Sequence, residues 1–139
     1  MNEPRASTSF ELRFRAPETD IDELGHVSNV AYVRWIQDVA KAHSVSVGLG
    51  VEAYRELGAV FVVRRHEVDY LAPVTGGEEV ALTTFVASFR GASSERRTRV
   101  TVGDREVARA VTSWAFVSLS TGRPTRISPA VVEAFAKGR

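Results

Sequence analysis

The stretch that organises this chain reads Thr19-Asp20-Ile21-Asp22-Glu23-Leu24-Gly25-His26-Val27-Ser28-Asn29. It carries carboxylates, an imidazole and a glycine immediately before a long apolar segment with helical periodicity. Ser28 or Asn29 is a suitable helix N-cap, because either side chain can accept hydrogen bonds from the first backbone N–H groups of a helix. The polar side chains are therefore expected at the positive end of a helix, where an acid/base site is favoured.

The expected helix runs from Ser28 or Asn29 to about Leu49, where Gly48 and Gly50 interrupt the pattern. One face of this helix is apolar and wide, which predicts that a sheet wraps around it. The apolar face collects Tyr32, Trp35, Ile36, Val39 and Ala42, and the polar face collects Arg34, Gln37, Asp38 and Lys41.

Five β-prone segments flank the helix in the sequence. Residues 10–16 alternate apolar and charged side chains, which predicts a half-buried strand that ends at Pro17. Segments 60–71, 80–89, 96–102 and 107–119 are separated by short turn-forming breaks, which favour antiparallel hairpins. Short helices are expected at 51–57 and 129–136. The sequence therefore predicts the α+β class, with a five-stranded antiparallel sheet across one long helix.

Length and composition predict one domain over residues 1–139, with residues 1–7 disordered. A net charge of +1 gives no global field that would select nucleic acid or an anionic membrane. The absence of cysteine excludes disulfides, thiolate metal sites and a cysteine nucleophile. No segment has the length of a membrane span or the character of a secretory leader, so the cytoplasm is the expected compartment.

One segment resembles the D-x-D-x-x-G-H-V-N-N-x-x-Y signature of the 4-hydroxybenzoyl-CoA thioesterase-like family of the hot-dog fold: it reads Asp20-Ile21-Asp22-Glu23-Leu24-Gly25-His26-Val27-Ser28-Asn29-Val30-Ala31-Tyr32. It is also similar to the equivalent stretch of long-chain acyl-CoA and acyl-ACP thioesterases. Residues 61–73 resemble the family's second strand and its exit. Ser28 departs from the signature, which usually has asparagine at that position.

The resemblance implies a hot-dog fold, in which the sheet wraps around the long helix. It further implies a homodimer or a dimer of dimers, with two sheets joined edge to edge and the active site at the dimer interface. Segments 60–71 and 107–119 carry apolar residues at both parities, which also predicts that a second subunit covers part of the outer sheet face. Neither a metal nor a cofactor is expected.

By motif position, the resemblance assigns Asp22 as the catalytic carboxylate, acting as a general base on water or as a nucleophile toward a thioester. The backbone N–H of Asn29 matches the donor that polarises the thioester carbonyl, and His26 matches a histidine that assists catalysis in some branches. Gly25 and Tyr32 fall at substrate-binding positions. The chemistry agrees, because thioester hydrolysis needs a base or nucleophile and fixed donors for the developing oxyanion.

Each of these residues also has a structural interpretation. Asp22 fits an Asx-turn before a helix, and Asp20 is expected to hold the loop through hydrogen bonds from its side chain to the backbone. His26 is either a base or relay near neutral pH or a hydrogen-bonded residue at the helix entry. His43 is expected to pack, and Asp38, a runner-up catalytic residue from a neighbouring branch, lies on the polar face. The two loop carboxylates and His26 lack a fourth ligand at a readable spacing, so no metal site is expected.

The densest basic stretch lies in one predicted hairpin. Arg90, Ser93 and Arg96 are predicted to bind the phosphates of a coenzyme A ester, which need guanidinium or hydroxyl partners. The hairpin resembles the family segment that offers them. Arg97 and Arg99 fit the solvated face of an antiparallel strand instead. Aromatic residues are not interleaved with this patch, which disfavours nucleic acid.

The sequence therefore predicts a hydrolase of acyl-CoA or acyl-ACP thioesters, with CoA favoured because no clear surface for an acidic partner is seen. A hot-dog hydratase or dehydratase usually takes its carboxylate and histidine from different parts of the fold. Asp22 and His26 lie on one short loop, which suits a thioesterase better. A module that binds an acyl chain without turnover would tolerate loss of Asp22. A structural subunit would not act on thioesters at all. The sequence does not select among short, long and aromatic acyl groups.

Overall fold

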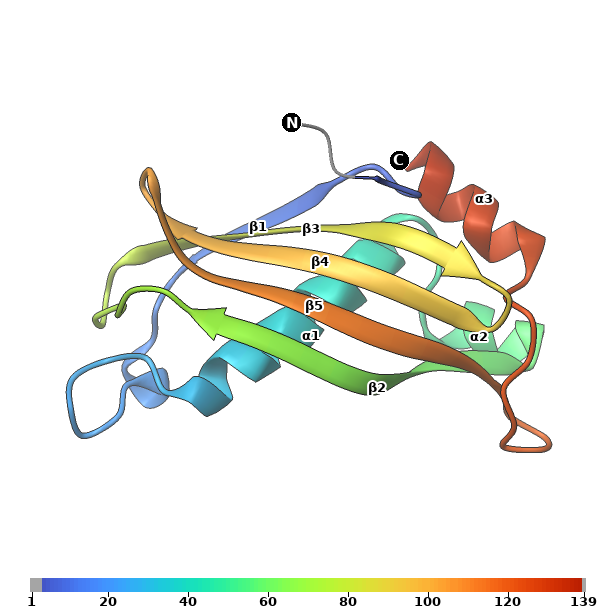
Figure 1. Ribbon diagram of the computed structural model, residues 1–139, viewed down its shortest axis with the longest axis horizontal. Helices are drawn as coiled ribbons and strands as arrows, with labels where there is room; N and C mark the ends of the chain where they lie inside the picture. The colour runs from blue at the N-terminus through green and yellow to red at the C-terminus, as the bar shows by residue number, and fades with distance from the viewer. Residues whose placement is uncertain (1–3, 139) are drawn as a thin grey trace.

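A five-stranded antiparallel sheet lies across one long helix, α1 (Asn29–Ser46), in the computed structural model, which describes residues 4–138 (Figure 1). The sheet order is β1-β3-β4-β5-β2, and two shorter helices lie toward one end of it (Figure 1). The predicted α+β fold is confirmed. The strands are β1 (Phe10–Arg15), β2 (Ala59–Tyr70), β3 (Glu79–Arg90), β4 (Ser93–Val102) and β5 (Arg105–Ser118), and the shorter helices are α2 (Val51–Leu57) and α3 (Pro129–Lys137).

The first strand shows how the alternation in the sequence becomes a two-faced sheet. Its apolar residues Phe10, Leu12 and Phe14 are half-buried, and the charged residues between them are exposed. All four strand pairings are antiparallel, as the short breaks between the segments predicted. One face of the sheet is therefore free to pack on α1.

Helix α1 begins where its cap predicted. The Ser28 hydroxyl accepts the Ala31 N–H at 3.2 Å, which satisfies one of the otherwise unpaired donors of the first turn. Trp35, Ile36 and Val39 are buried against the sheet, and all four residues of the predicted polar face are exposed. No helix within residues 4–138 is long and apolar enough to cross a bilayer.

Two boundaries and one additional element stand out as differences from the sequence prediction. Helix α1 ends at Ser46 rather than near Leu49, and β4 begins at Ser93 rather than at Arg96. A short 3-10 helix, η1 (Glu18–Asp20), precedes the loop that leads into α1. It was not predicted, because three residues are too few to show a periodic pattern.

The predicted disorder of residues 1–7 is wrong for Ala6 and Ser7. Both N–H groups donate to the Val86 carbonyl, at 2.7 and 3.2 Å, and the Ser7 hydroxyl accepts the Val86 N–H at 2.7 Å. The polar composition of the segment gave no sign that β3 would supply these partners. Residues 1–3 lie outside the described residues.

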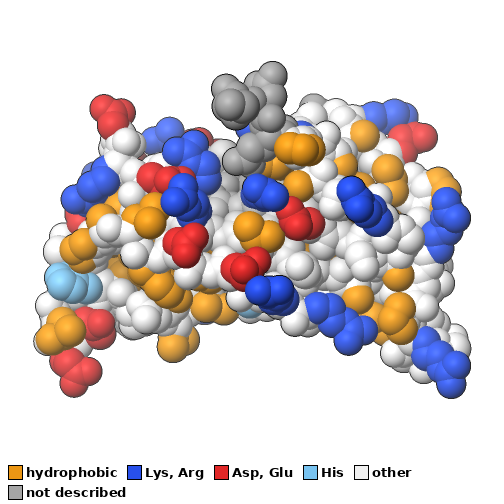
Figure 2. Space-filling view, viewed as in Figure 1, with side chains coloured by type: hydrophobic (Ala, Val, Ile, Leu, Met, Phe, Trp, Pro, Cys, Tyr) orange, Lys and Arg blue, Asp and Glu red, His pale blue; other side chains and the backbone are white. Residues whose placement is uncertain are grey.

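Strand β2 forms a long edge of the sheet. It has 12 residues, whereas β1, the strand at the other edge, has 6. Val62, Tyr70 and Leu71, in β2 or directly after it, are 37%, 44% and 45% exposed. Figure 2 shows hydrophobic side chains gathered on the side of the molecule where β2 ends. A long edge with exposed apolar side chains is typical of a surface that meets another chain.

Candidate active site

The loop between η1 and α1 is a tight turn closed by Asp22. The Asp22 N–H donates to the His26 carbonyl at 2.7 Å, and the Gly25 N–H donates to the Asp22 carbonyl at 3.0 Å. Gly25 has a φ of 81°, which glycine adopts without strain. One carboxylate oxygen of Asp22, Oδ1, accepts the Leu24 and His26 N–H groups at 2.9 and 3.2 Å. Asp22 therefore has the Asx-turn role that the sequence offered as its structural interpretation.

The other carboxylate oxygen of Asp22, Oδ2, accepts no hydrogen bond from residues 4–138. The side chain is half-buried. The two hydrogen bonds to Oδ1 hold the carboxylate in place, and Oδ2 stays available to a ligand or a water molecule. A carboxylate in this state can take a proton from water or attack an electrophile. The structural and catalytic interpretations of Asp22 are thus compatible.

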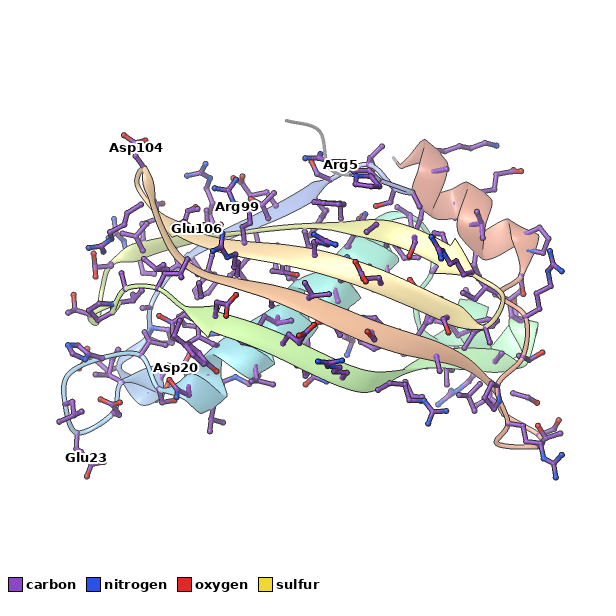
Figure 3. All side chains as sticks on the ribbon, in the orientation of Figure 1. Arg5, Asp20, Glu23, Arg99, Asp104 and Glu106 are labelled. Atoms are coloured by element: carbon purple, nitrogen blue, oxygen red, sulfur yellow. The ribbon has the colours of Figure 1, made fainter. Side chains whose placement is uncertain are left out.

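Asp20 fastens the same loop to α1. Its side chain is 6% exposed, and its carboxylate accepts the Trp35 indole N–H at 3.0 Å and pairs with Arg34. Its backbone carbonyl accepts the Ser28 N–H at 2.9 Å. Figure 3 shows Asp20 beside the start of α1, whereas Glu23 lies at the tip of the loop and points away from the molecule. Asp20 has a structural role, as predicted, but the expectation that its side chain bonds to the backbone is wrong, because its carboxylate accepts from the side chains of Trp35 and Arg34.

The first turn of α1 offers unpaired donors next to this loop. Ser28 caps the Ala31 N–H, but the N–H groups of Asn29 and Val30 donate to no residue among 4–138. The helix dipole adds partial positive charge at this point. The hydroxyl of Tyr70, at the end of β2, lies 3.5 Å from the Asn29 carbonyl oxygen. The donor expected at Asn29 is therefore available to a ligand.

His26 meets Asp22 through its backbone. It forms an isolated β-bridge with Thr75, and no hydrogen bond joins its imidazole to any described residue. The carboxylates of Asp20 and Asp22 are directed to different partners. Within residues 4–138, no three His, Asp or Glu side chains are placed to hold a metal ion.

Tyr32 lies in the core beneath the start of α1. It is 3% exposed, and its ring makes edge-to-face contacts with Trp35 and Tyr70, each at 5.3 Å between centroids. Burial, and after it the neighbouring Tyr70 and Glu78, raise the pKa of the Tyr32 phenol. In the single chain Tyr32 supports the helix entry, and its contact with substrate stays a prediction.

The residues predicted to bind phosphates are divided between the two faces of the sheet. Arg90 and Ser93 line a surface groove of about 650 Å³ at the β3–β4 hairpin, together with Arg64 of β2. Arg96 is 5% exposed and lines a different cavity, on the helix side of the sheet. The prediction that Arg96 shares a site with Arg90 is wrong. Arg90 of β3 pairs with Ser93 of β4, and Arg96 follows Ser93 by three positions. Because side chains alternate between the two faces of a strand, Arg96 lies on the opposite face from Ser93.

This cavity has a volume of about 260 Å³ and lies between the C-terminal half of α1, α2 and the sheet. Gln37 and Lys41, from the exposed face of α1, also border it, so it opens on that side. Such a space is suited to an apolar group. Its aromatic lining consists of Tyr54, Phe61, Phe89, Trp114 and Phe135.

A buried polar cluster forms part of the cavity wall. Arg96 Nη1 donates to His43 Nδ1 at 2.9 Å and to Thr84 Oγ1 at 3.1 Å. His43 is 1% exposed and stacks on Phe10 with 5.4 Å between centroids, which confirms that it packs. Burial, and after it the charge of Arg96, lower the pKa of His43 to about 4. Burial lowers the pKa of Arg96 to about 10, so at neutral pH His43 is neutral and Arg96 is charged.

The loop and this cluster lie toward opposite ends of α1. Asn29 is the first residue of the helix, and His43 is in its last turn, which separates them by about 21 Å along the axis. A thioester carbonyl at Asn29 and an acyl group beside Arg96 of the same chain would have to span that distance.

Comparison with known proteins relates this geometry to one family. Residues 17–135 match the thioesterase-like superfamily. None of the curated proteins compared matches the chain. The solved structures that match it share the hot-dog fold predicted from the sequence.

Three of these solved structures illustrate the likeness. A putative oleoyl thioesterase from Lactobacillus plantarum has a TM-score of 0.88 and 18% identity, over 93% of this chain and 50% of that one. The chain thus spans half the length of that protein. The DHNA-CoA thioesterase from Staphylococcus aureus has a TM-score of 0.82 and 17% identity, over 93% of this chain and 89% of that one. A hypothetical protein from Staphylococcus aureus, solved in complex with CoA, has a TM-score of 0.85 and 14% identity, over 96% and 87%.

The family match extends from the residue before η1 into α3, so it includes the loop, α1 and the whole sheet after β1. The chain belongs to the thioesterase-like superfamily.

Proposed function

We propose that the protein hydrolyses acyl-CoA thioesters to a free acid and coenzyme A. The observation that carries this proposal is the junction of loop and helix. There Asp22 keeps one carboxylate oxygen open, directly before a helix start whose Asn29 N–H has no partner among residues 4–138. Membership of the thioesterase-like superfamily supports the reaction class.

In the proposed reaction, the thioester carbonyl oxygen accepts a hydrogen bond from the Asn29 N–H. Asp22 Oδ2 then removes a proton from the water that attacks the carbonyl carbon, or it attacks that carbon itself and water opens the resulting anhydride. In both routes the C–S bond breaks and coenzyme A leaves as the thiol. The proposal also gives His26 the role of relaying that proton; because no hydrogen bond joins its imidazole to a residue among 4–138, the relay would pass through a water molecule. The helix dipole stabilises the developing oxyanion.

The proposed active form is a homodimer joined along β2. The C-terminal end of β2 carries Tyr70, which lies beside Asn29, and its N-terminal end carries Phe61, which lines the cavity. Antiparallel pairing of two β2 strands about a two-fold axis brings the C-terminal end of one next to the N-terminal end of the other. The helix start of one protomer then approaches the cavity of its partner, which removes the separation found within one chain.

The surface groove supports CoA as the carrier. Arg64, Arg90 and Ser93 line it, and guanidinium and hydroxyl groups are the usual partners of phosphate oxygens. The proposed role of the groove is to hold the nucleotide phosphates while the acyl end reaches the loop.

The experiment compares wild type, Asp22→Asn and Asp38→Asn on a panel of short, long and aromatic acyl-CoA esters, with release of free thiol as the readout. Asparagine at position 22 keeps an oxygen for the Leu24 and His26 N–H groups, so the loop should stay folded. We expect Asp22→Asn to lose about a hundredfold or more of kcat/KM. Asp38, an exposed carboxylate of α1, is the matched control and should keep wild-type turnover.

Equal turnover by wild type and Asp22→Asn would refute the catalytic assignment. A folded dimer that binds acyl-CoA but cleaves none of the panel would favour a non-catalytic acyl-binding module instead. A hydratase is less favoured, because no hydrogen bond joins the Asp22 carboxylate to the His26 imidazole.

A further inference from the structure

Arg96 is a buried cation without an acidic partner. Its side chain is 5% exposed, and no carboxylate among residues 4–138 forms an ion pair with it. Its neighbour Glu95 pairs with Arg97. The other groups around the Arg96 guanidinium are neutral or aromatic, and the ring of Phe135 lies 5.7 Å from the guanidinium carbon. An isolated buried charge is costly unless an opposite charge or several hydrogen bonds compensate it.

Only some of the N–H groups of the Arg96 guanidinium have hydrogen-bond acceptors among residues 4–138. Nη1 has two hydrogens, and both are used, on His43 Nδ1 and Thr84 Oγ1. Nε and Nη2 donate to none of the described residues, and neither is among the fully enclosed side-chain atoms that lack a partner. These two nitrogens form the edge of a guanidinium whose parallel N–H groups match the two oxygens of a carboxylate.

The cavity wall adds one more donor beside that edge. Ser94 precedes Arg96 by two positions on β4, so both side chains lie on the same face of the strand, and both line the cavity. Its hydroxyl has no hydrogen-bond partner among residues 4–138. The Tyr54 hydroxyl does not compete as a donor. Ser44 gives its own proton to the Leu49 carbonyl, so the Tyr54 O–H must donate to Ser44.

We propose that the cavity binds an acyl group that ends in a carboxylate, and that Arg96 pairs with this carboxylate through Nε and Nη2. The aromatic walls contact the methylene or ring portion of the acyl group, and the Ser94 hydroxyl supplies a third hydrogen bond. A phosphate fits less well, because it carries more charge and more acceptors than one guanidinium edge and one hydroxyl satisfy. This inference rests on the proposed thioester hydrolysis and names the substrate class of that site.

The first test uses two thioesters that differ only at the far end of the acyl chain, octanoyl-CoA and its ω-carboxylated counterpart suberoyl-CoA. We expect wild type to prefer suberoyl-CoA by about tenfold or more in kcat/KM, as one charged hydrogen-bonded pair provides. Arg96→Gln should abolish or reverse this preference. Arg99→Gln is the matched control, because Arg99 lies on the same strand but is exposed and pairs with Glu106 (Figure 3).

The preference of wild type decides the proposal even if Arg96→Gln fails to fold. Equal rates on the two thioesters, or a preference for octanoyl-CoA, would overturn it. So would a preference for suberoyl-CoA that survives in Arg96→Gln and is lost in Lys41→Gln, which would assign the carboxylate to the cavity mouth. Arg96-dependent inhibition by octanoate without any preference for suberoyl-CoA would mean that the cavity receives the product acid, and the proposal would be wrong.

A binding measurement separates this proposal from the proposed hydrolysis. Titration calorimetry with monomethyl suberate, which has one free carboxylate and needs no turnover, should show binding to wild type and a loss of about tenfold or more in Arg96→Gln. Binding of this kind without any thioester cleavage would leave the carboxylate site standing and refute hydrolysis. Cleavage of octanoyl-CoA without binding of monomethyl suberate would do the reverse.

Discussion

The indole N–H of Trp35 donates to the carboxylate of Asp20 across 3.0 Å, and both side chains are buried. Trp35 belongs to α1, and Asp20 belongs to the short helix before the loop, so this bond fixes the position of the loop relative to the helix start. Arg34 shares the carboxylate from the exposed side. The open carboxylate oxygen of Asp22 therefore owes its placement to a contact outside its own turn.

We predict that Asp20→Ala lowers the free energy of unfolding by about 1–3 kcal/mol, because it leaves the buried Trp35 N–H without an acceptor. Urea denaturation followed by fluorescence measures this change. Thioester turnover should also fall at temperatures where the variant is fully folded, since the loop loses its anchor. Glu23→Ala, at the exposed loop tip, is the control; if the two variants were equally stable, Asp20 would not anchor the loop.

Ser28 provides a second prediction on the same junction. Its hydroxyl accepts the Ala31 N–H at 3.2 Å, so Ser28→Ala should destabilise the protein by about 1 kcal/mol, the usual value of an N-cap. Ser28→Asn, which restores the residue expected from the family signature, should stay close to wild type because asparagine caps equally well. Thermal unfolding of the three proteins distinguishes these outcomes. An Ala variant as stable as wild type would show that the cap is dispensable.

Local signals explain why the helices and strands were predicted well. The end of α2 is set by Gly58, whose φ of 77° is the left-handed conformation that stops a helix, and α1 begins at a capping side chain. The alternation of β1 depends only on residues within it. Such features are written in a few neighbouring residues, so they can be predicted without knowledge of the whole fold.

The polar cluster beside the cavity depends on contacts that no local pattern contains. His43 of α1 and Arg96 of β4 meet only because the sheet lies over the helix. A signal for Arg96 was nevertheless present, because it shares its strand parity with Thr98 and Val100, both of which are buried. The basic character of the surrounding stretch outweighed that parity, and the surface interpretation of Arg96 followed.

His43 predicts how stability depends on pH. Its pKa is lowered from 6.5 to about 4 in the folded protein, so the unfolded chain binds a proton first as the pH falls. The contribution of His43 to the free energy of unfolding is therefore fully present above pH 6.5 and is lost as the pH falls toward 4. Between pH 6.5 and about pH 5 the loss should be about 2 kcal/mol.

The difference between wild type and His43→Gln isolates this contribution, because glutamine can still accept from Arg96 but does not titrate. Denaturation at a series of pH values should give a shallower decline for the variant. The comparison also removes the effect of His66, whose pKa is lowered by burial as well. Parallel declines in the two proteins would contradict the buried, neutral state of His43.

The distance between Asn29 and His43, about 21 Å along α1, predicts that each complete site takes parts from two protomers. Asp22→Asn lacks the carboxylate of the loop, and Arg96→Gln lacks the guanidinium of the cavity. As separate homodimers, both should turn over suberoyl-CoA poorly. When the two variants are refolded together, a mixed dimer combines the intact loop of one protomer with the intact cavity of the other. Random assembly should restore about a quarter of the wild-type sites.

Two differently tagged variants allow the mixed dimer to be isolated, and its rate on suberoyl-CoA is the measurement. Recovery shows that Asp22 and Arg96 act across the interface, because a mixed dimer has no restored site if both residues serve the same chain. No recovery, with the mixed dimer confirmed by mass, would place both residues in one protomer. The acyl group would then have to cover the full length of α1, and a preference for longer dicarboxylic acyl groups would be the consequence.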